Sequence, residues 1–224
     1  MKNIQKLGGI GSLIGAATNL FALIVFAAFL LPKGEGSDYI AFLADNQSFM
    51  RVFDIIIYLV FGVGIILLSI ALNERLKTGS SSLAQTVTIF GLIYAVLVIV
   101  VGTLSISSVT TVTKLYSDNP VQAATVWLIL DSVGKGLGGG GGETMISGLW
   151  ILFLSSVAFQ AREFPRMLNY FGLMVGVSGI FSVFFPQILG ISVFYGLGLI
   201  SWLAWLGIVM LRNIPILSQF PTQE

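Results

Sequence analysis

The side chains that could carry chemistry in this chain are few, and most lie in one stretch. The sequence has no Cys and no His, which excludes thiolate chemistry, Cys/His zinc sites and an imidazole general base. The acidic candidates are Asp131 and Glu143, either of which could act as a general acid or base. Lys135 follows Asp131 at the i, i+4 spacing of a helical ion pair. No paired-carboxylate motif accompanies them, so we expect no catalytic, cofactor or metal site.

A run of five glycines, residues 138–142, separates Lys135 from Glu143. A helix cannot be stable through this run, because each glycine costs about 1 kcal/mol relative to alanine. We expect a shaped backbone crossing, in which Gly139, Gly140 and Gly141 supply positive φ angles or a close approach that a Cβ would block. The alternative is a passive linker. A phosphate-binding loop is not expected, because the run has no Walker spacing and no following Lys-Ser or Lys-Thr.

Asn19 is the polar candidate in the middle of an apolar run. An amide in hydrocarbon is costly unless it is paired, so we expect Asn19 to face another helix or a ligand. Two G-x-x-x-G pairs also stand out, and small residues at this spacing let helix backbones approach closely. They are Gly11 with Gly15, and Gly172 with Gly176. The pattern predicts helix packing within the chain, and the alternative is the seam of a homo-oligomer.

The composition indicates the class of protein that holds these residues in place. Of the 224 residues, 56% are hydrophobic and only 9% are charged, whereas soluble domains carry about 25% charged residues. A soluble domain could not cover its surface with so little charge, so the chain is expected to be an integral membrane protein with the lipid bilayer as its partner. The net charge of +1 gives no basic field for nucleic acid.

Apolar runs near the length needed to cross a bilayer, about 20 residues, recur along the chain. They are residues 7–31, 53–72, 86–106, 144–160, 167–185 and 188–211. The first run is too long for a signal-peptide core and is taken as a span. We therefore predict an all-α fold, a six-helix transmembrane bundle forming a single domain over residues 1–224. Asp54 would sit at the start of the second span, where a carboxylate complements the helix N-terminus.

Lys and Arg in the short loops set the orientation. With the N-terminus in the cytoplasm, the basic residues on the inner side are Lys2, Lys6, Arg75, Lys77, Arg162, Arg166 and Arg212. Those on the outer side are Lys33, Arg51, Lys114 and Lys135. This excess on the inner side predicts that both termini are cytoplasmic.

Two outer segments are more than plain loops. Residues 36–52 have apolar side chains at helical spacing, which predicts an amphipathic helix in the outer interface or a cap over the bundle. In residues 107–143, Asn119-Pro120 is a helix start. The helix that follows, residues 121–137, is expected to lie on the surface or re-enter the membrane, and a full crossing is the alternative.

The second half of the sequence carries a family resemblance. Its parts are Gly148-Leu149-Trp150-Ile151-Leu152, the short turn Glu163-Phe164-Pro165-Arg166, and the glycine-spaced span 168–180. In these residues the chain resembles a bacterial multi-pass group known as domain of unknown function family 4386, although the five-glycine run is not part of that pattern. The resemblance implies a protein of the bacterial inner membrane with no assigned activity.

Three classes of function remain open. The first is a membrane subunit or scaffold without catalytic activity, which docks a membrane-protein partner or a second copy through its helix faces and outer segment. The alternative is a small-solute transporter or channel that binds its cargo near Asn19. The third is an intramembrane enzyme using Asp131 or Glu143.

Overall fold

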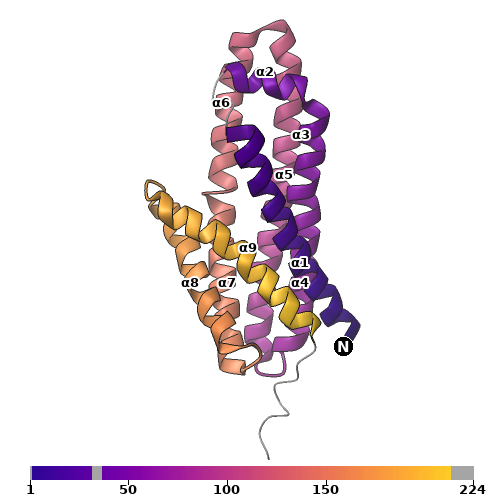
Figure 1. Cartoon of the computed structure of the whole chain (residues 1–224), viewed down its shortest axis with the longest axis vertical. Helices are drawn as coiled ribbons and strands as arrows, with labels where there is room; N and C mark the ends of the chain where they lie inside the picture. Colours follow the sequence, from indigo (N-terminus) through magenta and orange to yellow (C-terminus); the bar gives the residue numbers. More distant parts are fainter. Residues whose placement is uncertain (1, 32–36, 213–224) are drawn as a thin grey trace, which may run out of the picture.

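The computed structural model describes residues 2–31 and 37–212, and this part of the chain is almost entirely helical (Figure 1). The elements are α1 (Lys2–Val25), the π-helical turn η1 (Phe26–Leu30), α2 (Ser37–Asp45), α3 (Gln47–Asp54), the π-helical segment η3 (Ile55–Val60), α4 (Phe61–Leu76), α5 (Ser81–Asp118), α6 (Pro120–Leu137), α7 (Gly142–Ala161), α8 (Arg166–Phe184) and α9 (Leu189–Leu211). No strand occurs within residues 2–31 and 37–212.

Within the described part of the chain, six helical segments are long and apolar enough to cross a membrane. They are Asn3–Leu30, Gln47–Leu76, Ser81–Asp118, Pro120–Ala161, Arg166–Phe184 and Leu189–Leu211. This confirms the predicted all-α fold with six candidate spans and a multi-pass membrane protein. The second and third segments are longer than the sequence indicated, because helix continues past the apolar runs into residues of mixed polarity. The fourth segment is longer because it comprises α6 and α7, which the glycine run joins.

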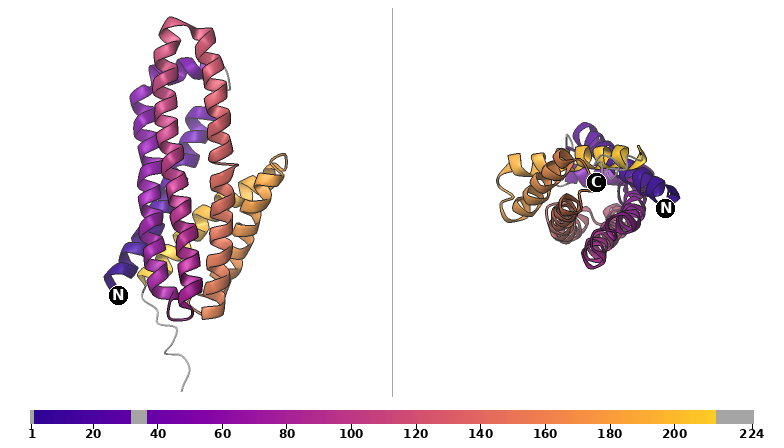
Figure 2. Two further views of the ribbon diagram at one scale, coloured as in Figure 1. Left: turned by 180° about the vertical axis from the view of Figure 1, so that it is seen from behind. Right: turned by 90° about the horizontal axis from the view of Figure 1, so that it is seen from below.

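The helices differ in length, and this divides the molecule into two tiers. At 1.5 Å per residue, the 20 residues of α7 and the 19 residues of α8 each span about 30 Å, the thickness of a bilayer core. The 38 residues of α5 span about 57 Å. Helices α1, α4, α7, α8, α9 and the first half of α5 form a six-helix tier, and the rest extends beyond the tip of the α8–α9 hairpin (Figures 1 and 2).

We call this extension the distal tier and define it as residues 26–31, 37–60 and 102–137. Helix α6 stands antiparallel to the second half of α5 and continues the line of α7 (Figure 2). It therefore does not lie flat, as a surface helix would. Helix α2 lies across the tier, below the turn between α5 and α6 (Figure 1), and its Ile40 and Leu43 are fully buried in clusters that include Val109 and Val112 of α5.

Close glycine contacts hold the six-helix tier together. A Cβ on Gly11 would come within 2.5 Å of the carbonyl oxygen of Gly64 on α4. Gly15 faces Phe61 and Leu203, which lie on α4 and α9. The α1 glycines thus pack against α4 and α9 of the same chain.

The second glycine pair lies on α8. Gly172 faces the Ser155 side chain of α7 and the Trp202 indole of α9, and Gly176 lies against the backbone of Gly148 and Leu152 on α7. In each pair the glycines contact helices of this chain, so the contacts are intramolecular.

Asn19 does not make the interhelical contact expected of it. Its Nδ2 donates to the carbonyl oxygen of Gly15, one turn earlier on α1, at 2.9 Å. The expectation of a partner on another helix is therefore wrong: in a half-buried position the amide is satisfied by its own helix. The buried side chain that links helices here is Ser12, whose hydroxyl donates to the carbonyl oxygen of Leu203 on α9 at 2.6 Å.

We therefore expect Asn19→Leu to change the free energy of unfolding by less than about 0.6 kcal/mol, the average for interhelical polar contacts in bilayers. The matched change Ser12→Ala, which removes an interhelical bond, should cost more. Thermal unfolding in detergent, followed by size-exclusion chromatography, compares the two. A larger loss for Asn19→Leu than for Ser12→Ala would contradict this interpretation.

Candidate functional site

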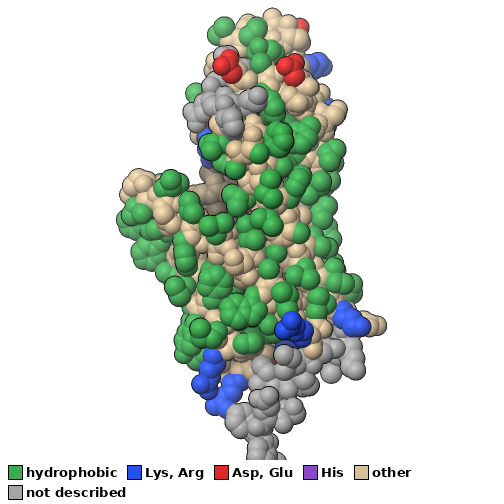
Figure 3. Space-filling model, in the orientation of Figure 1, with side chains coloured by type: hydrophobic (Ala, Val, Ile, Leu, Met, Phe, Trp, Pro, Cys, Tyr) green, Lys and Arg blue, Asp and Glu red, His purple; other side chains and the backbone are tan. Residues whose placement is uncertain are grey.

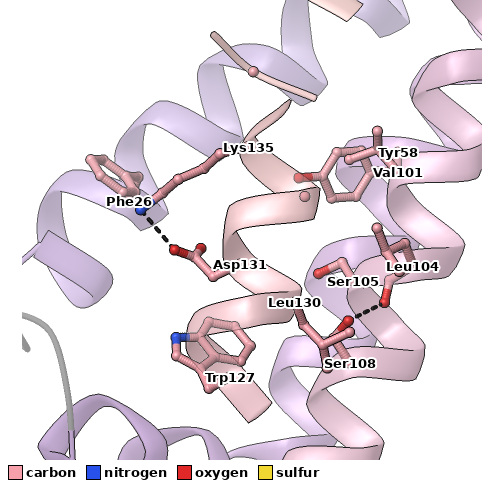
Figure 4. A pocket seen from close by; sticks show the side chains of 12 residues that line it. Phe26, Tyr58, Val101, Leu104, Ser105, Ser108, Trp127, Leu130, Asp131 and Lys135 are labelled. Carbon is pink, nitrogen blue, oxygen red and sulfur yellow. Dashed lines mark hydrogen bonds and ion pairs between the residues drawn. The ribbon is translucent and has the colours of Figure 1, made fainter. Parts of the chain in front are cut away.

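A lateral cleft in the distal tier lies beside ionisable side chains. It lies between η1 and α6, with α5 as its floor, and has a volume of about 400 Å³ (Figure 4). A neighbouring cavity of about 650 Å³ extends it toward α2. Phe26, Trp127, Asp131 and Lys135 line both cavities. In Figure 3 the surface is hollowed between the α8–α9 tip and the taller column of helices.

The cleft is apolar over most of its lining. Val101, Leu104 and Leu130 contribute aliphatic side chains from α5 and α6, and Phe26 and Trp127 contribute aromatic rings. Tyr58 of η3 also lines the cleft, and its hydroxyl points toward α6 (Figure 4). Such a lining suits a largely hydrocarbon molecule.

The ion pair predicted from sequence lies at this cleft. Lys135 Nζ is 2.8 Å from Asp131 Oδ2 (Figure 4). The Asp131 side chain is 30% exposed and that of Lys135 is 66% exposed, so both charges remain accessible to a ligand at the mouth of the cleft. Exposed pairs of this kind add less than about 1 kcal/mol to stability.

The floor of the cleft contains a buried carboxylate one layer below its surface. Ser105, which lines the cleft, donates its hydroxyl to Asp54 Oδ2 at 2.8 Å. Asp54 is 2% exposed. The expectation that Asp54 starts a helix is wrong, because the helical segment begins at Gln47 and passes through Asp54 without a break. Asp54, the last residue of α3, instead joins α3 to α5 through this hydrogen bond.

The roof of the extended cavity is aromatic. Tyr39 of α2 and Trp127 of α6 pack with ring centroids 5.5 Å apart and planes tilted by 45°. Burial, followed by the negative charges of Asp131 and Asp54, raises the pKa of Tyr39 to about 12. The phenol is neutral at physiological pH, as it would be at the ordinary pKa of tyrosine, and can donate a hydrogen bond.

The glycine run forms a compact joint between α6 and α7 at the base of the cleft. Gly140 has φ of 95°, a region that L side chains avoid. Gly141 lies so close to the carbonyl oxygens of Lys135 and Gly136 that a Cβ there would collide with backbone. Gly139 has open space around it. The Gly140 N–H donates to the Thr144 hydroxyl at 2.8 Å.

Because the glycines differ in these contacts, single alanine substitutions in the run should have different effects on stability. Gly141→Ala should destabilise the protein by about 2 kcal/mol, because the methyl group meets carbonyl oxygens that cannot move without breaking the end of α6. Gly139→Ala should be neutral or slightly stabilising, because alanine narrows the unfolded ensemble. Thermal unfolding of the two variants checks this, and equal effects would show that the joint is a passive linker.

Of the other residues singled out from sequence, Glu143 is half-buried in the first turn of α7. It is not among the residues that line either cavity. Asn19 and the α1 and α8 glycines also lie outside the lining. No group of three or more His, Cys, Asp or Glu comes together anywhere in residues 2–31 and 37–212.

Sequence reasoning missed most of the cleft. Phe26, Tyr58 and Ser105 come from three separate elements and look like ordinary span residues. Trp127 carries the one usable signal, since it lies one turn before Asp131 on the same helix. That spacing places an aromatic ring beside the ion pair.

The fold and the cleft define a multi-pass α-helical membrane protein with a distal helical extension. A family model described as a domain of unknown function (DUF4386) matches residues 7–210, and the chain belongs to this family. The match confirms the resemblance seen in the sequence. No curated protein and no solved structure matches the chain.

Proposed function

We propose that the protein is a membrane-embedded binding protein without catalytic activity, which holds an amphiphilic molecule in the lateral cleft. The observation that carries this proposal is the lining: an apolar cavity with one ion pair, Asp131–Lys135, at its mouth. Such a site can bind a hydrocarbon chain and its polar end together. It would act as a subunit or carrier in the bacterial inner membrane. Lys and Arg side chains gather at the end of the six-helix tier opposite the distal tier (Figure 3), and this basic end would face the cytoplasm.

The position of the cleft supports entry from the lipid. Gly138 contacts Val101, which lies 20 residues, or about 30 Å, along α5 from its start at Ser81. The base of the cleft is therefore one bilayer core away from the basic end of the molecule. A lipid-borne molecule could enter sideways at this height without crossing water.

A second candidate function, docking of a membrane-protein partner, is favoured by the outward face of α6. Val121, Ile129 and Val133, which line neither cavity, are 79%, 59% and 47% exposed. They lie beyond the six-helix tier, on a part of the chain that a core of about 30 Å does not reach. Apolar surface in this position is typical of an interaction site, and a scaffold would use it to hold a second protein.

Filling the cleft tests the binding proposal. A Cβ added at Gly134, which lines the cleft, meets no atom within 4 Å, and the same is true of Gly136, which lies outside the lining. Gly134→Leu should therefore place a side chain in the cavity without a clash. Native mass spectrometry of the protein purified in mild detergent should show a bound amphiphile in the wild type and in Gly136→Leu, and at least about tenfold less in Gly134→Leu.

Equal retention in the two variants, or no bound molecule in the wild type, would overturn the binding proposal. The same purification examines the docking candidate. A stoichiometric second protein that is lost in Ile129→Ser, while the amphiphile is retained, would support docking through α6.

A further inference from the structure

The larger cavity brings together groups that suit a positively charged amine. Phe26, Tyr39 and Trp127 present three aromatic rings to the same space, and Asp131 adds a carboxylate. Lys135 stands beside the carboxylate at 2.8 Å. We propose that this cavity is a head-group site for a zwitterionic phospholipid, one that carries an ammonium and a phosphate. The inference rests on the proposed function and names the class of amphiphile.

The ammonium half is recognised by the aromatic rings and Asp131. Ring faces attract cations electrostatically, and cages of aromatic side chains are a recurrent solution for binding ammonium groups. Tyr39 and Trp127 are in contact, with centroids 5.5 Å apart and planes tilted at 45° to one another, so they are not a flat stack. Asp131 is one helical turn from Trp127 and supplies the counter-charge.

The phosphate half is recognised by Lys135. An ammonium side chain binds phosphate as a point charge, and the Lys135 side chain is 66% exposed. Asp131 and Lys135 together have no net charge. The Asp131 carboxylate would repel an anionic head group, and the Lys135 ammonium would repel a cationic one. A head group with both charges can satisfy both side chains, so charge complementarity favours the zwitterion.

The lipid chains provide the reason to prefer a phospholipid over a free head group. The two cavities share Phe26 and Trp127 and continue into the apolar lining of Val101, Leu104 and Leu130. A small polar zwitterion would leave this lining in contact with water. A lipid would cover it with its acyl chains, which pass from the bilayer to another apolar environment at little cost.

Head-group preference can be measured in nanodiscs that contain equal amounts of phosphatidylethanolamine and phosphatidylglycerol. The lipids that remain bound after ejection of the protein are identified by native mass spectrometry. The wild type should retain the zwitterionic lipid about tenfold over the anionic one, a ratio in the range expected for a cation held by aromatic rings and a carboxylate. Free glycerophosphoethanolamine, added as a competitor at the same concentration, should not displace the lipid.

Variants of cavity residues, compared with matched controls, test whether the head-group preference arises in this cavity. Asp131→Asn and Trp127→Leu should each reduce the ratio severalfold while total bound lipid stays high, because the apolar lining is intact. The controls are Asp118→Asn, at the exposed end of α5, and Trp205→Leu, on an exposed position of α9. Both should leave the ratio unchanged.

The outcomes separate the two proposals. Bound lipid with no head-group preference, or a preference that survives Asp131→Asn and Trp127→Leu, overturns the zwitterion site and leaves the cleft as an amphiphile site. Displacement by free glycerophosphoethanolamine overturns the lipid in favour of a soluble ligand of the same chemistry. No lipid retained in any variant overturns the head-group site together with the proposed function.

Discussion

Gly176→Val is expected to destabilise the protein by about 3 kcal/mol or more, the largest effect of any single substitution considered. A Cβ at Gly176 would lie 2.7 Å from the backbone nitrogen of Leu152 and 2.8 Å from the carbonyl oxygen of Gly148, both on α7. Backbone atoms cannot rotate away as a side chain can, so α7 and α8 would have to separate. Overpacking of an interior usually costs about 1–3 kcal/mol. A branched side chain that collides with a backbone should cost about 3 kcal/mol or more, because the backbone cannot move aside.

The matched control is Gly196→Val on α9, where an added Cβ meets no atom within 4 Å. Gly196→Val changes helix propensity and hydrophobicity by the same amount as Gly176→Val, but its side chain does not collide with another backbone. Thermal unfolding in detergent, read by fluorescence-detected size exclusion, should show a large loss for Gly176→Val and a small change for Gly196→Val. Similar melting temperatures for both variants would contradict the close α7–α8 contact.

Arg75→Met should destabilise the protein by about 2 kcal/mol. Arg75 joins the end of α4 to the turn between α7 and α8. Its Nε donates to Glu163 Oε2 at 2.9 Å, its second guanidinium nitrogen donates to the Glu163 carbonyl at 3.1 Å, and its charge lies 4.7 Å from the Phe164 ring centroid. Removing one partner of a fully buried pair costs about 3–5 kcal/mol. The Glu163 side chain is 20% exposed, so water reduces the cost.

Lys77→Met is the control for this prediction, because it removes an equivalent charge from the same end of the molecule. Lys77 pairs with Glu74 at 2.6 Å, but their side chains are 45% and 30% exposed. An exposed pair adds less than about 1 kcal/mol, so the melting temperature should barely change. If the two methionine variants unfold at the same temperature, the Arg75–Glu163 pair has no special structural role.

The spans could be predicted from sequence because a long apolar run has few alternatives to a membrane helix. Their true ends could not be predicted. Polar residues such as Ser108 and Thr113 follow the apolar run of α5, yet the helix continues to Asp118, and these hydroxyls donate to the carbonyl oxygens of Leu104 and Val109. The extra length of α5, and therefore the distal tier, depends on such local hydrogen bonds and on pairing with α6.

In the candidate site, residues that are close in the sequence could be predicted, whereas residues that meet only through tertiary packing could not. Asp131 and Lys135 were found because i, i+4 spacing places them together on any helix. For the glycine run, Gly140 has the positive φ and Gly141 the close approach that were expected, whereas Gly139 has neither, so the expectation for Gly139 is wrong. The aromatic wall could not be foreseen, because Phe26, Tyr39 and Trp127 meet only after η1, α2 and α6 come together.

The most direct test of the central proposal, that an amphiphile occupies the cleft, is quenching of Trp127 fluorescence by bilayer lipids brominated on their acyl chains. The Trp127 signal is the difference between the wild type and Trp127→Phe. Strong quenching is expected in the wild type and in Gly136→Leu, and its loss is expected in Gly134→Leu, whose new side chain fills the cavity. Equal quenching in the two leucine variants, or none in the wild type, would show that lipid chains do not enter the cleft.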